Sequence, residues 1–276
     1  MRSLFVVSTP IGNLEDITLR ALRILGDVRL IAAEDTRTAR ILLRKYGIRT
    51  RTVSYNEHNM RRRTPQLLAA LETGDIALVS EAGTPGVSDP GHELITAAIE
   101  RGFPIVPIPG PSALTAALTA SGLPMRQFTF LGFLPRRAAE RRRLLTPAAR
   151  EPRTLVLFEA PHRLRQTLED LGDAFGQRRI AVCREVTKAF EEIFRGTAAE
   201  ALAHFDNPRG EFTIVIEGAT GEELLSDENV HRHLAEARDR GLSARDAVKV
   251  VSAATGRAHR EVYSLWLELT QGTPDR

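Results

Sequence analysis

The sequence predicts an α/β protein with two sheet domains and a helical tail. Two patterns indicate this fold class. Through the first half of the 276 residues, short apolar runs alternate with helical patterns, as is typical of a parallel sheet with helices on both faces. The second half repeats the alternation more loosely, and a short strand next to a turn favours a mixed sheet there.

Strands of the first domain are expected at the apolar runs 4–8, 28–33, 76–80 and 105–108. Helical patterns lie between them, over 17–25, 38–46, 62–71 and 93–100. A helix of small residues over 113–120 ends at Gly122, and Pro124 follows, which together form a stop signal. We therefore expect the first domain to span residues 1–122.

The second domain is expected to span residues 123–220. Its strands are predicted at 128–133, 154–158, 179–186 and 212–217, with a shorter one at 191–194 and a helix over 161–175. After Gly221 the pattern changes to two helices, over 243–254 and 257–269, separated by Thr255 and Gly256. Residues 221–276 are therefore interpreted as a separate helical tail.

The composition excludes several classes of protein. No apolar run approaches the roughly 18 residues of a membrane span, and the amino terminus lacks the long apolar segment of a signal peptide. The lone Cys183 excludes an internal disulfide, and the histidines show no metal-ligand spacing. We therefore expect a cytoplasmic protein without a metal site or a membrane contact. Its basic residues are almost all arginine, which suits phosphate recognition, although a solvated arginine-rich surface explains the same composition.

Three loops rich in glycine and proline each follow a predicted strand. They read STPIGNLED (8–16), SEAGTPGVSDPG (80–91) and PIPGPSA (107–113). In a parallel sheet the carboxyl ends of the strands share one edge, where such folds bind ligands. Glycine lets the main chain approach a ligand closely, so the loops indicate a ligand held by backbone, although tight turns without a ligand use the same residues. None of them matches a dinucleotide fingerprint or a P-loop. Asp89 and Pro90 are expected to start the next helix.

Eight motifs follow one another between residues 9 and 218. They are TPIGNLEDITLRAL (9–22), AEDTRTARILL (33–43), SEAGTPGVSDPG (80–91), PIPGPSA (107–113), FLGFLPRR (130–137), FEAPHRL (158–164), REVTKAFEE (184–192) and GEFTIVIEG (210–218). Together they resemble one family, the tetrapyrrole-methylase-like S-adenosylmethionine transferases. Within it, the match is to the branch that methylates the ribose 2′-oxygen of a cytidine in the decoding centre of 16S rRNA.

The resemblance implies a two-domain tetrapyrrole-methylase-like fold, S-adenosylmethionine in the cleft between the domains, and a homodimer. It carries over a set of cofactor-binding residues: Pro10, Gly12, Ser80, Glu81, Ala82, Gly83, Ser112, Ala113, Leu131, Gly132, Phe158, Gly210, Phe212 and Thr213. Two positions depart from the family, because Glu81 stands where aspartate is common and Ala160 where serine is frequent. The first loop also departs from that of porphyrinogen methylases, which disfavours such a substrate.

A ribose hydroxyl is a weak nucleophile that benefits from a general base or from a nearby cation. The candidates are Glu34, Asp35, His162, Glu185, Lys188, Glu191 and Glu192. We expect Lys188 and Glu185 to be catalytic and to lie near the acceptor, since lysine can lose its proton when it is buried. Asp35 and Arg37 are expected to position RNA, although a helix cap explains Asp35 equally well. Lys188 also fits an ordinary surface lysine.

Arginine clusters are the expected contacts to RNA phosphates. They comprise Arg62 with its neighbours in 61–63 and, in the segment 133–144, Arg136, Arg137, Arg141, Arg142 and Arg143. The tail resembles a helix-turn-helix with Ser243 as N-cap and Gly256 at the turn. Its basic residues suit rRNA, and its apolar residues suit a packing or dimerisation hairpin equally well.

Three classes of function are compatible with these patterns. The first is a ribose methyltransferase acting on 16S rRNA or the 30S subunit. The second is a methylase of a small tetrapyrrole, which shares fold and cofactor. The third is a cofactor-binding ribosome-assembly factor without catalysis. The loops, the arginine clusters and the order of the motifs favour the first.

Overall fold

Five parallel strands form the sheet of the first domain in the computed structural model, which describes residues 2–220, 227–255 and 257–271. They are β1 (Leu4–Val7), β2 (Leu30–Ala33), β3 (Thr52–Ser54), β4 (Ile76–Val79) and β5 (Ile105–Ile108), in the order β3-β2-β4-β1-β5. The central strand, β4, is buried along its whole length, as expected for a strand covered on both faces. The carboxyl ends of all five strands therefore meet at one edge.

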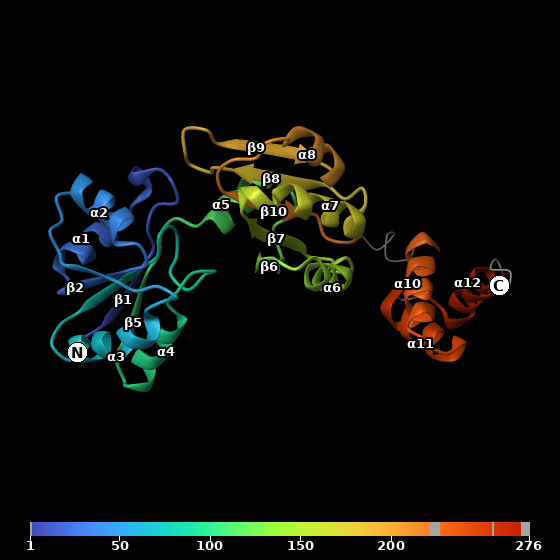
Figure 1. Cartoon of the computed structure of the whole chain (residues 1–276), viewed down its shortest axis with the longest axis horizontal. Coiled ribbons are helices and arrows are strands. Elements are labelled where there is room, and N and C mark those ends of the chain that lie inside the picture. Colours follow the sequence, from blue (N-terminus) through green and yellow to red (C-terminus); the bar gives the residue numbers. More distant parts are fainter. Residues whose placement is uncertain (1, 221–226, 256, 272–276) are drawn as a thin grey trace.

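Helices cover both faces of this sheet (Figure 1). One face carries α1 (Leu19–Asp27) and α2 (Thr36–Lys45) over a core centred on Ile31 and Val79. The other face carries α3 (Met60–Leu71) and α4 (His92–Glu100) over Leu4 and Leu78. A short 3₁₀ turn, η1 (Leu14–Asp16), lies in the first loop.

The second domain contains a mixed sheet, as predicted. Its strands are β6 (Phe128–Phe133), β7 (Thr154–Glu159), β8 (Ile180–Arg184), β9 (Glu192–Gly196) and β10 (Phe212–Ile216), in the order β6-β7-β10-β8-β9. Only the β6–β7 pair is parallel among these described strands, and the other pairs are antiparallel. One face is covered by α6 (Ala138–Ala148), α7 (Leu164–Phe175) and α8 (Ala198–His204). The expected α/β class is thus confirmed.

The helix α5 (Ala113–Ser121) covers the other face of the second sheet. Its Ala117 and Leu118 pack against Val156 and Val215, and the guanidinium of Arg195 donates to the Ser121 carbonyl at 3.1 Å. The helix expected at the end of the first domain therefore belongs by its packing to the second. The domain limits stay a prediction, and this packing favours a first boundary near residues 109–112.

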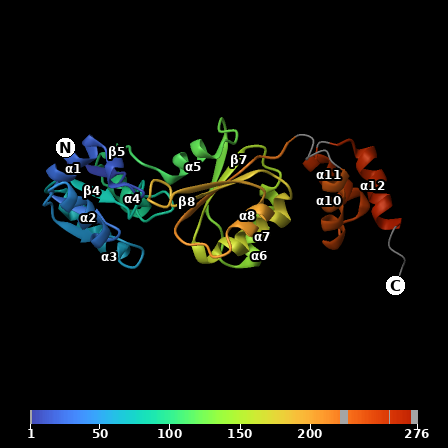
Figure 2. The same ribbon diagram turned by 90° about the horizontal axis from the view of Figure 1, so that it is seen from above.

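The tail is a bundle of three helices, α10 (Asp227–Asp239), α11 (Ala244–Thr255) and α12 (His259–Gln271), around a core of its own. Figures 1 and 2 show it beside the second domain, at the opposite end of the molecule from the first. Ser243 is the expected cap, because its hydroxyl accepts from the Asp246 amide at 3.2 Å. Gly256 lies outside the described residues. The sequence did not predict α10, nor the elements β3 and α8, and it placed the arginines of 133–144 within two helical turns without giving the bounds of α6.

Candidate active site

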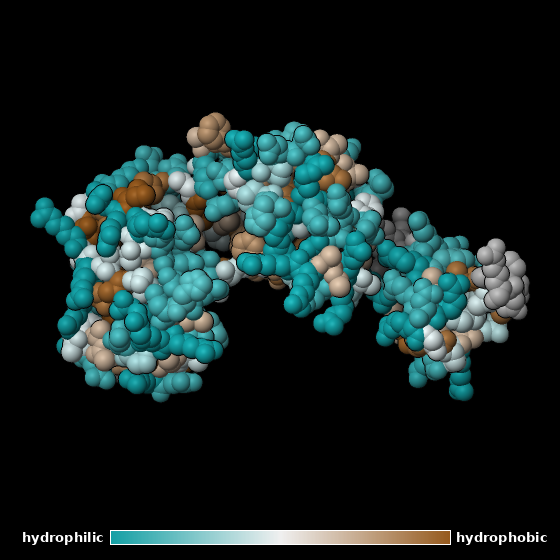
Figure 3. Space-filling view, viewed as in Figure 1, coloured by the Kyte–Doolittle hydropathy of each residue, from teal (hydrophilic) through white to brown (hydrophobic). Residues whose placement is uncertain are grey.

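A cavity of about 310 Å³ lies between the two sheet domains, within the roughly 300–1,000 Å³ of small-molecule sites. The first domain and the start of α5 contribute Ile11, Ala82, Gly83, Thr84, Val87, Asp89, Ser112 and Ala113. The second domain contributes Phe133, Phe158, Glu159, Ala160, Pro161, Cys183, Val186, Glu211, Phe212 and Thr213. Figure 3 shows the surface hollowed where the two domains meet, with hydrophobic residues in the hollow.

Main chain forms the first-domain wall of the cavity. The Thr9 and Gly83 backbones exchange two hydrogen bonds, of 2.8 and 3.0 Å, which join the loops after β1 and β4. The hydroxyls of Ser8 and Thr84 lie 2.9 Å apart beside this bridge. Gly83 has a φ of +73°, a conformation that strains residues with side chains. The glycines of the opening loops thus shape a wall that a ligand can approach closely.

The start of α5 offers the polar part of the wall. Ser112 is the N-cap, but in the described structure its side chain bonds to none of the helix amides. The free amides of a helix N-terminus attract anionic groups. The hydroxyl of Ser112 and the first amides of α5 are therefore available to a carboxylate in the cavity.

Aromatic rings form the opposite, apolar wall. The Phe158 ring makes edge-to-face contacts with Phe130 and Phe133, with centroids 5.0 and 5.7 Å apart. Phe212 and Thr213, from β10, continue this wall next to Cys183 of β8. Such a surface suits a flat apolar group of the ligand.

The structure brings half of the expected cofactor residues to the cavity: Ala82, Gly83, Ser112, Ala113, Phe158, Phe212 and Thr213. Pro10, Ser80 and Glu81 instead line a small adjoining cavity of about 40 Å³. Leu131 faces an open hollow of about 920 Å³ at the outer edge of β6. A Cβ on Gly132 would lie 3.2 Å from the Ser88 hydroxyl, which places Gly132 beside the loop after β4.

The last two expected glycines lie where loops from different elements touch. A Cβ on Gly12 would lie only 2.3 Å from Cγ of Lys188, and one on Gly210 only 2.4 Å from Cγ of Glu185. The Asn13 amide also donates to the Thr187 hydroxyl at 3.1 Å. The first loop of the first domain therefore rests directly on the loop after β8.

The expected catalytic pair, Lys188 and Glu185, forms a salt bridge outside the cavity lining. The Lys188 ammonium donates to Glu185 and Glu211, at 2.8 Å each. Burial opposes the positive charge, but the two carboxylates outweigh it and raise the pKa of Lys188 above its ordinary value. The expectation that burial lets this lysine lose its proton is therefore wrong. Glu211, which was not predicted, completes the cluster.

Asp35 is the N-cap of α2, which was one of the two interpretations that the sequence allowed. Its carboxylate accepts from the Arg37 amide and from the Arg37 guanidinium, each at 2.7 Å. These contacts lower the pKa of Asp35 to about 2. The neighbouring Glu34 accepts from the Glu81 amide at 3.0 Å, so that the loops after β2 and β4 are joined. Burial raises the pKa of Glu34.

The other candidate acids and His162 lie outside the cavity lining. Glu191 accepts from the Thr187 amide at 2.6 Å, and Glu192 pairs with Arg184 and His204. His162 is exposed within the 3₁₀ turn η2 (Pro161–Arg163). The carboxylates of Glu191 and Glu192 therefore hold backbone and neighbouring side chains, and among the described contacts Glu191 touches Lys188 only through its backbone amide, which donates to the Lys188 carbonyl at 3.1 Å.

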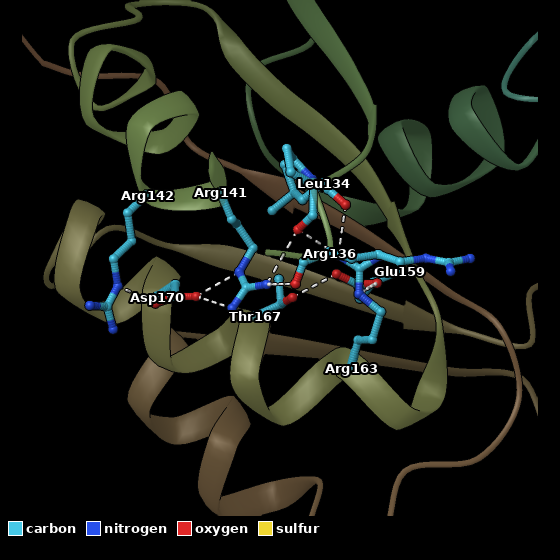
Figure 4. A network of polar contacts seen from close by, with 9 residues as sticks. Leu134, Arg136, Arg141, Arg142, Glu159, Arg163, Thr167 and Asp170 are labelled. Carbon is cyan, nitrogen blue, oxygen red and sulfur yellow. Dashed lines mark hydrogen bonds and ion pairs between the residues drawn. The ribbon is translucent and has the colours of Figure 1, made fainter. Parts of the chain in front are cut away.

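Arg141 is not on the surface, so its expected contact with RNA is wrong. It is 2% exposed, and its guanidinium donates to Asp170 at 2.6 Å and to the Pro135 carbonyl at 3.3 Å (Figure 4). Arg142 also binds Asp170, at 2.9 Å, but from the surface. The same network contains Arg163, which donates to the Leu134 carbonyl at 2.7 Å. Arg62, Arg136, Arg137 and Arg143 are exposed.

The model of the family described as Tetrapyrrole (Corrin/Porphyrin) Methylases matches residues 3–202. The chain belongs to the tetrapyrrole methylase family. It is similar to a protein of Synechocystis sp. named "Ribosomal RNA small subunit methyltransferase I", with 47% identity over 98% of this chain and 99% of that protein. A protein of Thermotoga maritima with the same name is 47% identical over 79% of this chain and 99% of its own length.

Among solved structures, this tetrapyrrole methylase is similar in fold to the uroporphyrin-III C-methyltransferase of Thermus thermophilus complexed with S-adenosylhomocysteine. The TM-score is 0.57 at 19% identity, covering 78% of this chain and 97% of that one. The predicted two-domain fold is thereby confirmed.

Within residues 2–220, 227–255 and 257–271, no group of three histidine, cysteine or acidic side chains is placed to hold a metal ion. No helix of the same ranges is both long and apolar enough to cross a bilayer.

Besides Glu211, the cavity contains two acids that the sequence did not predict as site residues, Asp89 and Glu159. Asp89 was expected to start α4, but that helix begins at His92 with Gly91 as its cap. The sequence did contain a signal for Asp89 as a site residue. It is an acid between Gly86 and Gly91 in a loop expected to bind a ligand, where it does not need to cap a helix. Glu159 ends β7, at the edge where the cavity lies.

Proposed function

We propose that the protein uses S-adenosylmethionine to methylate the ribose 2′-oxygen of a cytidine in the decoding region of 16S rRNA. The observation that carries the proposal is the similarity, at 47% identity over 98% of the chain, to a protein named as a small-subunit rRNA methyltransferase. The exposed arginines Arg136 and Arg137 at the edge of the second domain are consistent with an RNA substrate. Their cluster supplies positive charge without base selectivity.

The cavity fits the cofactor by the chemistry of its walls. The hydroxyl of Ser112 and the amides of α5 suit a carboxylate, and Phe158 and Phe212 suit an adenine ring. The Gly83 backbone permits a close approach. When bound, the cofactor supplies an electrophilic methyl group. The protein residues hold and align the two reactants, which accounts for much of the acceleration in such displacements.

We place the acceptor nucleotide at the mouth of the cavity, near the Lys188 cluster. A lysine that keeps its charge stabilises a developing alkoxide. Glu185 and Glu211 hold the ammonium in place at 2.8 Å each. Lys188 and Glu185 thus stay predicted catalytic residues, with Lys188 acting as a cation. Asp35 and Arg37, at the same sheet edge, stay predicted RNA contacts, and a homodimer in the cytoplasm stays the predicted assembly.

The test is a methylation assay with radiolabelled S-adenosylmethionine and 30S subunits that lack the modification. We expect label on a cytidine 2′-oxygen in the decoding region, located by nuclease digestion and mass spectrometry. Naked 16S rRNA, tested in parallel, shows which form is the substrate. Label on neither, with the cofactor bound, would contradict the proposal and favour an assembly factor. Label on a porphyrinogen would favour a small-molecule methylase.

A further inference from the structure

Four titratable side chains line the cavity: Asp89, Glu159, Cys183 and Glu211. Methyl transfer to a hydroxyl releases a proton, so a group that can accept it is needed in the cavity. The contacts of the four groups decide which of them is free to do so.

Glu159 is committed to the structure of the second domain. It is 2% exposed and accepts from the Thr167 hydroxyl at 2.6 Å and from the Ala160 amide at 2.9 Å. Its third partner is the Arg163 guanidinium, at 3.3 Å (Figure 4). These donors occupy both oxygens of Glu159, so its carboxylate is engaged in holding the second domain together.

Cys183 and Glu211 are also unsuited to the task. Burial raises the pKa of the Cys183 thiol to about 11, so it stays protonated near neutral pH. Glu211 forms a salt bridge of 2.8 Å with Lys188, so its carboxylate is already engaged by a cation.

Asp89 differs from the other three in its surroundings. It forms no salt bridge within the described part of the chain. Its loop, which follows β4, is joined to the loop after β1 by the bridge between Thr9 and Gly83. The groups that face it are the Ser80 hydroxyl, which hydrogen-bonds to it, and the carboxylates of Glu34, Glu81 and Glu211. Burial raises the pKa of Asp89 to about 7, and the charge of Glu34 adds to this effect. A base with a pKa near the working pH is the most effective kind.

We propose that Asp89 is the general base of the reaction, which takes the proton from the hydroxyl that is methylated. This inference rests on the proposed function. The substrate oxygen forms its bond to the methyl carbon as the O–H proton moves to the Asp89 carboxylate. The sulfur keeps the electron pair of the broken S–C bond and becomes a neutral thioether. Asp89 then returns the proton to solvent.

The test compares the pH dependence of methylation for the wild-type protein, Asp89→Asn and Asp89→Glu, on the substrate that the wild type accepts. We expect the wild-type rate to fall as the pH is lowered through about 7, because Asp89 becomes protonated. The Asn variant should lose about 10²–10⁴-fold in rate and lose this limb of the profile. The Glu variant should keep the limb at a reduced rate. Glu57→Gln, which removes an exposed carboxylate of the same domain, is the matched control and should keep the wild-type profile.

Cofactor affinity, measured by calorimetry, separates this role from a cofactor contact and also reports folding. We expect the Kd for S-adenosylmethionine to be the same in the wild type and in Asp89→Asn. An Asn variant that keeps the wild-type rate and pH profile would overturn the role of Asp89 as a base but not the proposed function. An Asn variant that binds S-adenosylmethionine at least tenfold more weakly would have the same consequence. A wild-type protein that binds the cofactor but methylates neither 30S subunits nor rRNA would overturn the proposed function and, with it, the base role.

Discussion

Arg141 and Arg142 follow one another on α6, yet only Arg141 points into the core. An arginine keeps its charge in any protein environment, so its burial requires Asp170, itself buried, and the backbone carbonyls of Pro135 and Arg136. These contacts tie α6 to α7. They also hold the segment after β6, in which Arg136 is exposed at the rim of the second domain. A buried ion pair thereby positions the surface that we propose for RNA.

Replacing Arg141 with alanine should destabilise the second domain by about 3–5 kcal/mol, because it leaves the Asp170 carboxylate buried without its main partner. Arg142→Ala is the matched control, since its side chain is 63% exposed and binds the same carboxylate. The control should lose far less stability. Urea unfolding of both variants, followed by circular dichroism, measures the difference. Equal losses would show that the buried pair does not stabilise the domain.

The burial of Arg141 was partly visible in the sequence. Arg141 lies four residues before Leu145, so both occupy one face of a helix, and Leu145 is fully buried. An arginine on an apolar face needs a carboxylate partner, but Asp170 is distant in the chain and was not predictable from spacing. Asp89 was misread for a similar reason. Its loop suggested a helix cap, while its proposed role is supported by a pKa that burial and the charge of Glu34 raise, and only the tertiary fold brings these about.

Elements with strong apolar patterns were the most predictable. The strands β1, β4 and β5 lie where apolar runs were expected. The missed helix α8 is short and carries the turn Thr197-Ala-Ala-Glu200, a capping-box sequence that could have revealed it. The segment of α6 was interpreted as an arginine cluster within two helical turns, and its many polar residues conceal the face that buries Leu145 and Arg141. Charge patterns were thus interpreted as function where they also encode structure.

The capping box of α8 should be measurable as stability. Thr197 accepts from the Glu200 amide at 3.3 Å, and Thr197→Ala should cost about 1 kcal/mol. Thr146→Ala is the control: its hydroxyl bonds the Arg142 carbonyl within a helix, where such a bond adds little. Amide hydrogen exchange of α8 would report the loss. Unchanged protection of α8 would contradict the cap's contribution.

Two sheet domains and the tail lie in a row (Figure 2), and the cavity lies between the first two. The tail contacts the second domain through Arg150, whose guanidinium nitrogens lie 2.6 and 3.0 Å from the two ring nitrogens of His233. Burial lowers the pKa of His233, which favours its neutral form there. Because the three units lie in a row, a substrate as large as a ribosomal subunit can contact all of them while one nucleotide enters the cavity.

At this scale, the affinity for rRNA should depend on salt. Removing two phosphate contacts with the double variant Arg136→Gln/Arg137→Gln should lower the slope of log K against log salt by up to about 2. The double variant Arg20→Gln/Arg23→Gln, on α1, removes the same charge from exposed positions elsewhere. Filter binding at several salt concentrations would compare them. Equal slopes for the two double variants would argue against the proposed arginine surface.

The reactivity of Cys183 can report how accessible the cavity between the two sheet domains is to solvent. It is the single cysteine of the chain, its side chain is fully buried between β8 and α5, and its thiol contributes to the cavity wall. Alkylation by iodoacetamide requires a thiolate that solvent can reach, so the folded protein should react far more slowly than the unfolded chain. S-adenosylmethionine should slow the reaction further, as measured by mass spectrometry over time. A reaction as fast as that of the unfolded chain would mean that the thiol is not protected. The rate of this one covalent modification thus measures how often the Cys183 thiol becomes accessible to solvent, and no cysteine has to be engineered into the chain.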